Sequence, residues 1–495
     1  MGWARAVLAV VAAGGLLVSG GSEADPRTPP ALPGEPPPFL GTAVVGDGGL
    51  TAAIDAYGDV VDLRVPGPAG RGVIDNPSER QAAGTVPAGT GIVPLVSLEG
   101  RRARPLWTAG AVWQRYRPGT NVVVTTARFR QASVRIVYAA HRSHLACLTE
   151  ASGGARVELR SAEPAAERFL RCDGGSARRT IKAAEHSDRD WLRRARPLAA
   201  AAPPWSVAMY ERSLLVLRAL TDRHSGAVAA GARDGWAYVW PRDAATAAIA
   251  FAAAGYRREA EQTTRFLLGL GLDRAARFHG DGSPVPGRPA QGDAIGWVAV
   301  AAQASGLIGS ARHAARILSP TYPPPWRDRS DYQEGQPGDY LGNAIAADAM
   351  KAPLDGPKPT RGLVRRLGDH GSGLDSAAAW AVEPFRRRAL YPQARKTMLR
   401  LARGDGRFGI TPGEGWPGRD SWSAPTAWTV WSLAALGERR PALRLLADLR
   451  RAAIPTGALP ERVDSRTGIP ASTTPLAWSH AFAILALRRL WPAGP

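Results

Sequence analysis

The residues best suited to chemistry form a short aromatic and charged segment, Asp234–Asp243, with the sequence DGWAYVWPRD. Its three aromatic rings offer flat apolar faces, while Arg242 and Asp243 supply hydrogen-bond donors and acceptors. A pyranose ring, with its C–H face and its hydroxyls, needs both kinds of partner. The same residues also suit a helix start, because Pro241 fits a first turn and an aspartate favours the positive end of the helix dipole. The chain has 16 tryptophans against 10 tyrosines and 9 phenylalanines, a bias that favours the sugar-binding interpretation.

Two further segments carry carboxylates among polar and aromatic residues. Glu334 lies in SDYQEG, and Glu461 lies in LPERVD, which leads into the PLAWSH segment that ends at His480. Hydrolysis of a glycosidic bond needs one carboxyl to protonate the leaving oxygen and another to activate water or attack the sugar carbon. A single glutamate in a loop is more often solvated or paired with an arginine. The two glutamates alone therefore leave both interpretations open.

The sequence lacks the residue patterns that are typical of metal, nucleotide and nucleic-acid binding. Two cysteines, Cys147 and Cys172, are too few for a four-ligand zinc site, and no CxxC, HExxH or GxxxxGK spacing occurs. Basic residues outnumber acidic ones by 63 to 43, but only four of the 63 are lysines, and the arginines are spread along the chain. We interpret this excess as a compositional bias rather than as a nucleic-acid-binding patch. We therefore expect no metal, no organic cofactor and no nucleic-acid partner.

The elements that position these residues follow an export segment and a linker. Residues 1–24 have a positive start, an apolar run from Ala6 to Val18 and small residues at a cleavage point, which is the pattern of a secretory signal peptide. The apolar run is shorter than the roughly 20 residues that span a bilayer, so we predict secretion without a stable membrane anchor. Residues 25–38 contain seven prolines and should form an extended linker.

The remaining chain divides into a β-rich part and a helical part. From 39 to 182, short β-branched segments bounded by Gly, Pro or Asn predict an antiparallel sandwich. Outside the cytoplasm, Cys147 and Cys172 in this part could pair as a disulfide. A charged connector, 183–204, follows, and from 205 to 495 apolar residues recur at every third or fourth position. About twelve such stretches predict an all-helical domain, built as a ring of helix pairs around a central pocket. The predicted strands are 111–116, 121–126, 133–138 and 155–160.

In their order, the motifs resemble glycoside hydrolase family 15, which contains glucoamylases, glucodextranases and some trehalases. YVWPRDAA at 238–245 is similar to the family's most recognisable motif, and RSLLVLRALTD at 212–222 resembles the opening of its catalytic domain. GRPAQGD at 287–293 resembles its next sugar-binding loop, and LPE at 459–461 with PLAWSH at 475–480 resembles its closing segment. The resemblance covers nearly the whole predicted mature chain.

The resemblance implies a multidomain, mainly α protein in which an N-terminal antiparallel β-sandwich precedes an (α/α)6 barrel. It also implies an inverting hydrolase that releases glucose from the non-reducing end of an α-linked oligosaccharide or polysaccharide. By position, Glu334 would be the general acid and Glu461 the general base. The residues that would hold the terminal glucose or line the pocket are Trp240, Arg242, Asp243, Asp293, Trp416 and Trp478.

Two residues depart from the family pattern. Gln333 precedes the predicted acid where members usually have a tryptophan, and Trp236 stands where many have a tyrosine whose hydroxyl helps to hold the catalytic water. An indole donates a hydrogen bond but does not accept one. Two alternatives to a glucoamylase-like function stay open, an α,α-trehalase and a catalytically weak carbohydrate-binding relative. A third, a basic protein that binds the cell envelope, would need clustered arginines.

Overall fold

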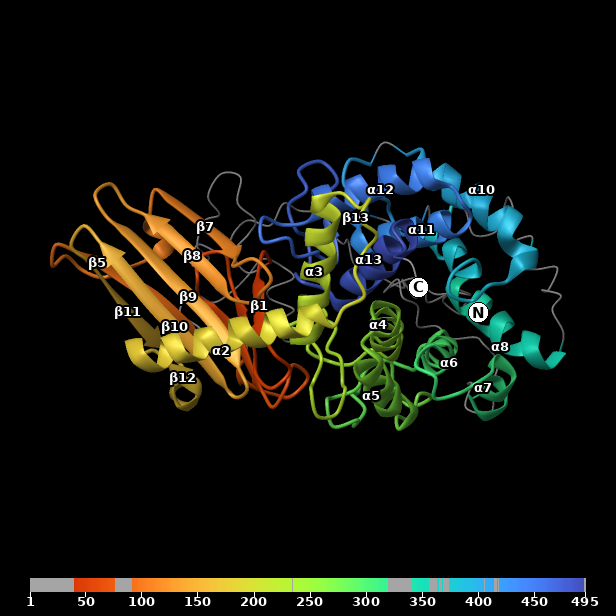
Figure 1. The fold of residues 1–495 in the computed structure, drawn as a ribbon, viewed down its shortest axis with the longest axis horizontal. Helices are drawn as coiled ribbons and strands as arrows, with labels where there is room; N and C mark the ends of the chain where they lie inside the picture. The colour runs from red at the N-terminus through yellow and green to blue at the C-terminus, as the bar shows by residue number, and fades with distance from the viewer. Residues whose placement is uncertain are drawn as a thin grey trace, which may run out of the picture.

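The computed structural model describes residues 40–75, 91–233, 235–318, 341–355, 363–364, 367, 374–404, 406–413, 416 and 418–493. The predicted signal peptide and linker and the predicted acid Glu334 lie outside these residues. The described residues form a β-rich part followed by a helical part (Figure 1).

Two sheets make up the β-rich part. The first has the strand order β1-β2-β3-β5-β11, with β4 paired to β3 and β6 paired to β5. The second has the order β12-β10-β9-β8-β7, and only the short β12 runs parallel to its neighbour. The strands of the first sheet are β1 (Ala43–Gly46), β2 (Thr51–Ile54), β3 (Val60–Val65), β4 (Arg71–Ile74), β5 (Ile92–Leu98), β6 (Arg104–Pro105) and β11 (Ala155–Ser161). Those of the second are β7 (Ala111–Tyr116), β8 (Val123–Arg128), β9 (Ser133–His141), β10 (His144–Ser152) and β12 (Leu170–Arg171).

The two sheets pack face to face, and the edge strands β7 and β11 alternate between more and less buried residues. In β7, the side chains of Val112, Gln114 and Tyr116 are buried while those between them are exposed, as expected for a strand with one covered face. One apolar cluster joins Ile54 of the first sheet to Ile136 of the second. Strands β7, β9 and β11 begin where the sequence predicts them, and β8 begins two residues later.

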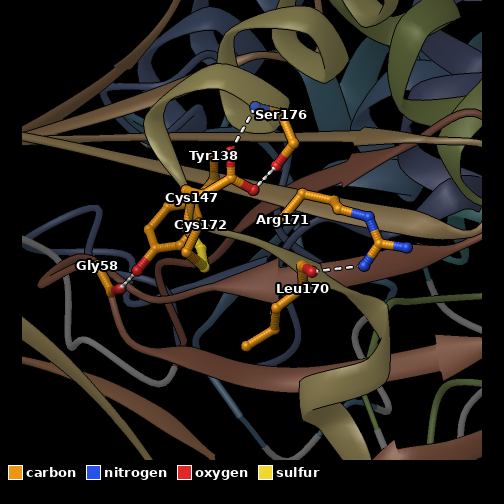
Figure 2. The surroundings of a disulfide bond; sticks show 8 residues. Gly58, Tyr138, Cys147, Leu170, Arg171, Cys172 and Ser176 are labelled. Carbon is orange, nitrogen blue, oxygen red and sulfur yellow. Dashed lines mark hydrogen bonds between the residues drawn. A yellow bond between two sulfur atoms is a disulfide. The ribbon is translucent and has the colours of Figure 1, made fainter.

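A disulfide joins Cys147 of β10 to Cys172, which follows β12 (Figure 2). Directly after it, the Asp173 side chain accepts a hydrogen bond from the backbone N–H of Ser176 at 2.8 Å and so caps helix α2 (Gly174–Arg193). Helix α2 lies along the second sheet and packs on β9 and β10 (Figure 1). Helix α2 begins within residues 39–182, which the sequence analysis assigned to the β-rich domain. The alternating pattern of a strand ends at β12, and apolar residues then recur at helical spacing.

The helical part contains two kinds of helix. One kind is buried for most of its length: α3 (Pro204–Ala219), α4 (Pro241–Ala254), α6 (Ala294–Ala304), α11 (Ser423–Ala435) and α13 (Ala477–Leu490). The other kind buries one apolar face: α5 (Arg257–Leu268), α7 (Ala311–Leu318), α10 (Tyr391–Ala402) and α12 (Arg439–Ala452). A helix that is apolar all round belongs in a core, whereas an amphipathic helix lies at the surface. Accordingly, α4 packs against α5, α6 and α13, and α11 packs against α12 and α13.

Three shorter or partly buried elements complete the described helical part. They are α8 (Leu341–Asp355) and the 3-10 helices η4 (Ser376–Ala381) and η5 (Arg388–Leu390). A two-stranded antiparallel sheet pairs β13 (Ser421–Trp422), just before α11, with β14 (Arg462–Val463), which follows α12. Within the described ranges, no helix has the length and apolar character needed to cross a membrane.

Candidate active site

Three buried helices each contribute a predicted site residue from their start. Arg242 lies in the first turn of α4, Asp293 directly precedes α6, and Trp478 lies in the first turn of α13. Because α4 packs against both α6 and α13, the three side chains meet. Arg242 Nη1 lies 3.3 Å from Asp293 Oδ2, and the guanidinium carbon of Arg242 lies 4.3 Å from the centre of the Trp478 ring.

The ion pair of Arg242 and Asp293 is shielded from water. Their side chains are 5% and 2% exposed, respectively. Burial raises the pKa of the Asp293 carboxyl above its ordinary value, and the adjacent guanidinium opposes that shift. A pair this deeply buried is weak evidence for stability, because desolvation offsets much of the Coulomb attraction. The pair matters for its geometry, because it holds the planar guanidinium of Arg242 and the carboxylate of Asp293 in fixed positions.

Trp240 and Asp243 stand beside the ion pair at the start of α4. Trp240 is the residue before the helix and Pro241 occupies its first position, so the helix start that the sequence predicts is confirmed. The side chains of Trp240 and Asp243 are both buried. The segment therefore serves as a helix start and as a source of site residues, and these two interpretations do not exclude each other.

Arg277 is a neighbour of this segment that the sequence analysis did not identify. Its guanidinium carbon lies 4.9 Å from the ring centre of Tyr238 and 5.8 Å from that of Trp240. An isolated β-bridge between two loops brings it there, so no local signal pointed to the contact. A cavity of about 510 Å³ lies along the same loop, and its lining includes Gly287 and Arg288 of the predicted sugar-binding loop.

Glu461 lies in the loop just before β14, and hydrogen bonds hold its backbone on two sides. Its N–H donates to the carbonyl of Thr473 at 2.9 Å, and its carbonyl accepts from the N–H of Ser423, the first residue of α11, at 3.0 Å. The hydroxyl of Ser472 donates to Glu461 Oε2. This hydrogen bond orients the carboxylate, and a general base must be oriented in this way. Ser472 was not identified from the sequence, because only the folded loop brings it to Glu461.

A buried histidine ties the Glu461 loop to α13. The N–H of Leu459 donates to His480 Nε2 at 2.9 Å, so the ring proton resides on Nδ1, which donates to Ser213 Oγ at 2.9 Å. Burial lowers the pKa of His480 to about 3, and the imidazole is therefore neutral at neutral pH. The residues before Glu461 are thus fixed to the helix that carries Trp478.

The remaining predicted site residues lie at the edge of this cluster or outside the described chain. The ring centre of Trp416 lies 5.0 Å from that of Trp422, whose strand β13 pairs with β14 at Arg462. Trp416 therefore lies beside the strand pair that contains Arg462, the residue after Glu461. Glu334 lies outside the described residues, so its distance from Glu461 stays a prediction.

Comparison with known proteins identifies a fold. No family model and no curated protein sequence matches the chain. A bacterial glucoamylase complexed with acarbose aligns with a TM-score of 0.58 at 11% sequence identity, over 93% of this chain and 96% of that chain. The chain has a glucoamylase fold.

Two other solved structures match a smaller share of the chain. A wild-type glycosidase, at 21% identity and a TM-score of 0.47, covers 57% of this chain and 96% of its own. A glucoamylase from Hormoconis resinae, at 13% identity and a TM-score of 0.43, covers 58% of this chain and 73% of its own. The glucoamylase fold agrees with the family 15 resemblance that the motifs suggest.

Proposed function

We propose that this chain is an exported, inverting glycoside hydrolase of family 15 that releases glucose from the non-reducing end of α-linked glucans. The observation that carries the proposal is the Arg242–Asp293 pair beside Trp478, joined through α13 to the loop of Glu461. The glucoamylase fold supports it. We also infer that the buried and amphipathic helices are the inner and outer layers of an (α/α)6 barrel.

The terminal glucose, in this proposal, is held at the starts of α4, α6 and α13. Arg242 and Asp293 supply charged donors and acceptors to sugar hydroxyls, and burial strengthens these hydrogen bonds because water competes less. The Trp478 ring is itself buried and lies under the Arg242 guanidinium, so we infer that it orients Arg242. Trp240, Asp243 and Trp416 complete the proposed pocket.

The chemical step requires two carboxyl groups. Glu461 takes a proton from the water that attacks the anomeric carbon, while Glu334 protonates the departing glycosidic oxygen. The Ser472 hydrogen bond orients the Glu461 carboxylate for this role. Inversion requires the two carboxyls to stand about 6.5 to 9.5 Å apart, which leaves room for the water.

Glucose release and its stereochemistry test the proposal. Maltose, maltooligosaccharides, isomaltose and trehalose are offered to the full chain, and proton NMR follows the first minutes of hydrolysis. Release of β-glucose first from maltooligosaccharides is the expected result, and α-glucose first would overturn the inverting mechanism. A clear preference for trehalose would instead indicate the trehalase alternative, and binding without release would indicate a catalytically weak relative.

The base is tested by Glu461→Gln, with Glu163→Gln as a matched control. Glu163 is an exposed glutamate of the β-rich part, so the same chemical change there should leave turnover unchanged. Loss of proton transfer should lower kcat of Glu461→Gln by about 10² to 10⁴-fold. Near-normal kcat would remove Glu461 from the base role.

A further inference from the structure

The outer helices α10 and α12 carry an unusual excess of positive charge. Helix α10 contains three basic residues and no acidic residue, and α12 contains five basic residues and one acidic residue. By contrast, the surface helices α2 and α5 together contain eight basic and five acidic residues. Helix α7 also contains two arginines and no acidic residue. What distinguishes α10 and α12 is that they contact each other, so their basic residues are brought together.

The two helices lie side by side along the outer edge of the helical part (Figure 1). Hydrogen bonds from α12 to the end of α10 fix their alignment. Arg444 donates to the carbonyls of Ala402 and Gly404, and Arg451 Nε donates to the carbonyl of Arg407 at 2.8 Å. Ala402, Gly404 and Arg407 consequently lie alongside about two turns of α12.

Five arginines on these elements form what we call the basic face. Arg400 and Arg403 lie at the end of α10, Arg407 follows it, and Arg440 and Arg444 lie one turn apart on α12. All five are exposed. Within the described ranges, none of them forms an ion pair, and Arg444 satisfies its guanidinium on backbone carbonyls instead.

Two described carboxylates at the border of the basic face already pair with other arginines. Glu438 pairs with Arg395 at 2.5 Å, and Asp448 pairs with Arg451. Asp448 also attracts Arg444 electrostatically, so among the described residues it is Arg400, Arg403, Arg407 and Arg440 that carry most of the positive charge of the face. Clustered like charges raise the local potential and attract a polymer of opposite charge.

We propose that the basic face binds a linear anionic glycan, a polysaccharide with regularly spaced carboxylate, sulfate or phosphate groups. Guanidinium groups bind such anions through two parallel hydrogen bonds. On α12 the basic face runs from Arg440 to Arg444, about 6 Å along the helix axis, and Arg400, Arg403 and Arg407 widen it across the end of α10. The disulfide of Cys147 and Cys172 indicates an oxidising compartment, where a glycan is a more accessible polyanion than a nucleic acid. The choice of a glycan rests in part on the proposed function.

The experiment measures binding of the full chain to dextran sulfate and to polygalacturonate at several salt concentrations, with neutral dextran as the blank. The test variant is Arg400→Gln with Arg403→Gln and Arg407→Gln. The control variant is Arg178→Gln with Arg179→Gln and Lys182→Gln, which removes the same charge from exposed positions of α2. The test variant should bind about tenfold more weakly or worse, and its slope of log affinity against log salt should fall by about 2, because each contacting cation contributes roughly 0.7 to 0.9. The control should stay within about threefold of the parent.

Three results would overturn the proposal. An equal loss in both variants would mean that net charge alone drives binding. Tighter binding of a single-stranded DNA oligonucleotide than of both anionic glycans would indicate a nucleic-acid partner. No binding of either glycan at about 50 mM salt would show that the basic face does not bind anionic glycans. Glucose release from maltose, measured in parallel, should be unchanged in both variants. A chain without this activity but with the expected binding would refute the proposed function and leave the basic face standing.

Discussion

Lowering the pH should reduce the free energy of unfolding through protonation of His480, which holds the loop that carries Glu461. The pKa of this histidine is lowered from 6.5 to about 3 by burial. A histidine with a lowered pKa in the folded state binds its proton more readily in the unfolded chain. Its contribution to stability is therefore complete above about pH 6.5 and is lost as the pH falls toward about 3.

The size of this effect follows from the width of that window. Each pH unit inside it lowers the free energy of unfolding by about 1.4 kcal/mol, so this one group should remove about 3 kcal/mol between pH 7 and pH 4. The structural reason is that a protonated Nε2 could no longer accept the N–H of Leu459. A charge would also be placed where the imidazole is fully buried.

The assay compares the parent chain with His480→Gln by urea unfolding at pH 7 and pH 4. Glutamine does not titrate, and its amide oxygen can accept the Leu459 N–H. Imperfect packing should make the variant about 1 to 3 kcal/mol less stable at pH 7. At pH 4 this difference should shift by about 3 kcal/mol in favour of the variant, because the parent alone loses stability through this group. Other titrating groups cancel in the comparison.

A difference in unfolding free energy that stays the same at pH 7 and pH 4 would refute the reasoning. It would mean that His480 has the same pKa in the folded and unfolded chains, so burial would not penalise its charged form.

Two further predictions concern single hydrogen bonds and charges. Ser472→Ala removes the donor that orients Glu461 Oε2, and losing a hydrogen bond worth about 1.5 kcal/mol should lower kcat for maltose hydrolysis by about tenfold. Ser472→Thr keeps the hydroxyl and should retain the parent kcat; an unchanged kcat in Ser472→Ala would contradict the role of the hydrogen bond. In the β-rich part, burial and the neighbouring Asp55 carboxyl raise the pKa of Asp59 well above its ordinary value. Ionising Asp59 therefore costs more free energy in the folded chain than in the unfolded chain, and the free energy of unfolding falls as the pH rises from about 4. Asp59→Asn should therefore stabilise the chain by about 1 to 3 kcal/mol at pH 8 and by much less at pH 4 in urea unfolding, and a variant less stable than the parent at pH 8 would count against this prediction.

Local patterns in the sequence predicted the local elements. The alternation in 111–116 marks a strand because successive side chains point to opposite faces, and β7 spans those residues. Pro241 and Asp243 marked a helix start because both suit the first turn, and α4 begins there. The start of α2 was less clear, since a charged amphipathic helix resembles a connector when its apolar face is narrow.

The tertiary structure decided which distant side chains meet. Arg242 and Asp293 are neighbours only because α4 packs against α6, and Ser472 reaches Glu461 only because the chain folds back within one loop. The sequence also led us to interpret the arginines as spread along the chain, although Arg400 and Arg444 share one face of the folded protein. Periodicity and turn chemistry extend over a few residues, whereas contacts across a core depend on how whole helices pack. Local patterns could therefore predict the elements, and the family resemblance could name candidate site residues, whereas the contacts between residues on different elements could be found only in the folded chain.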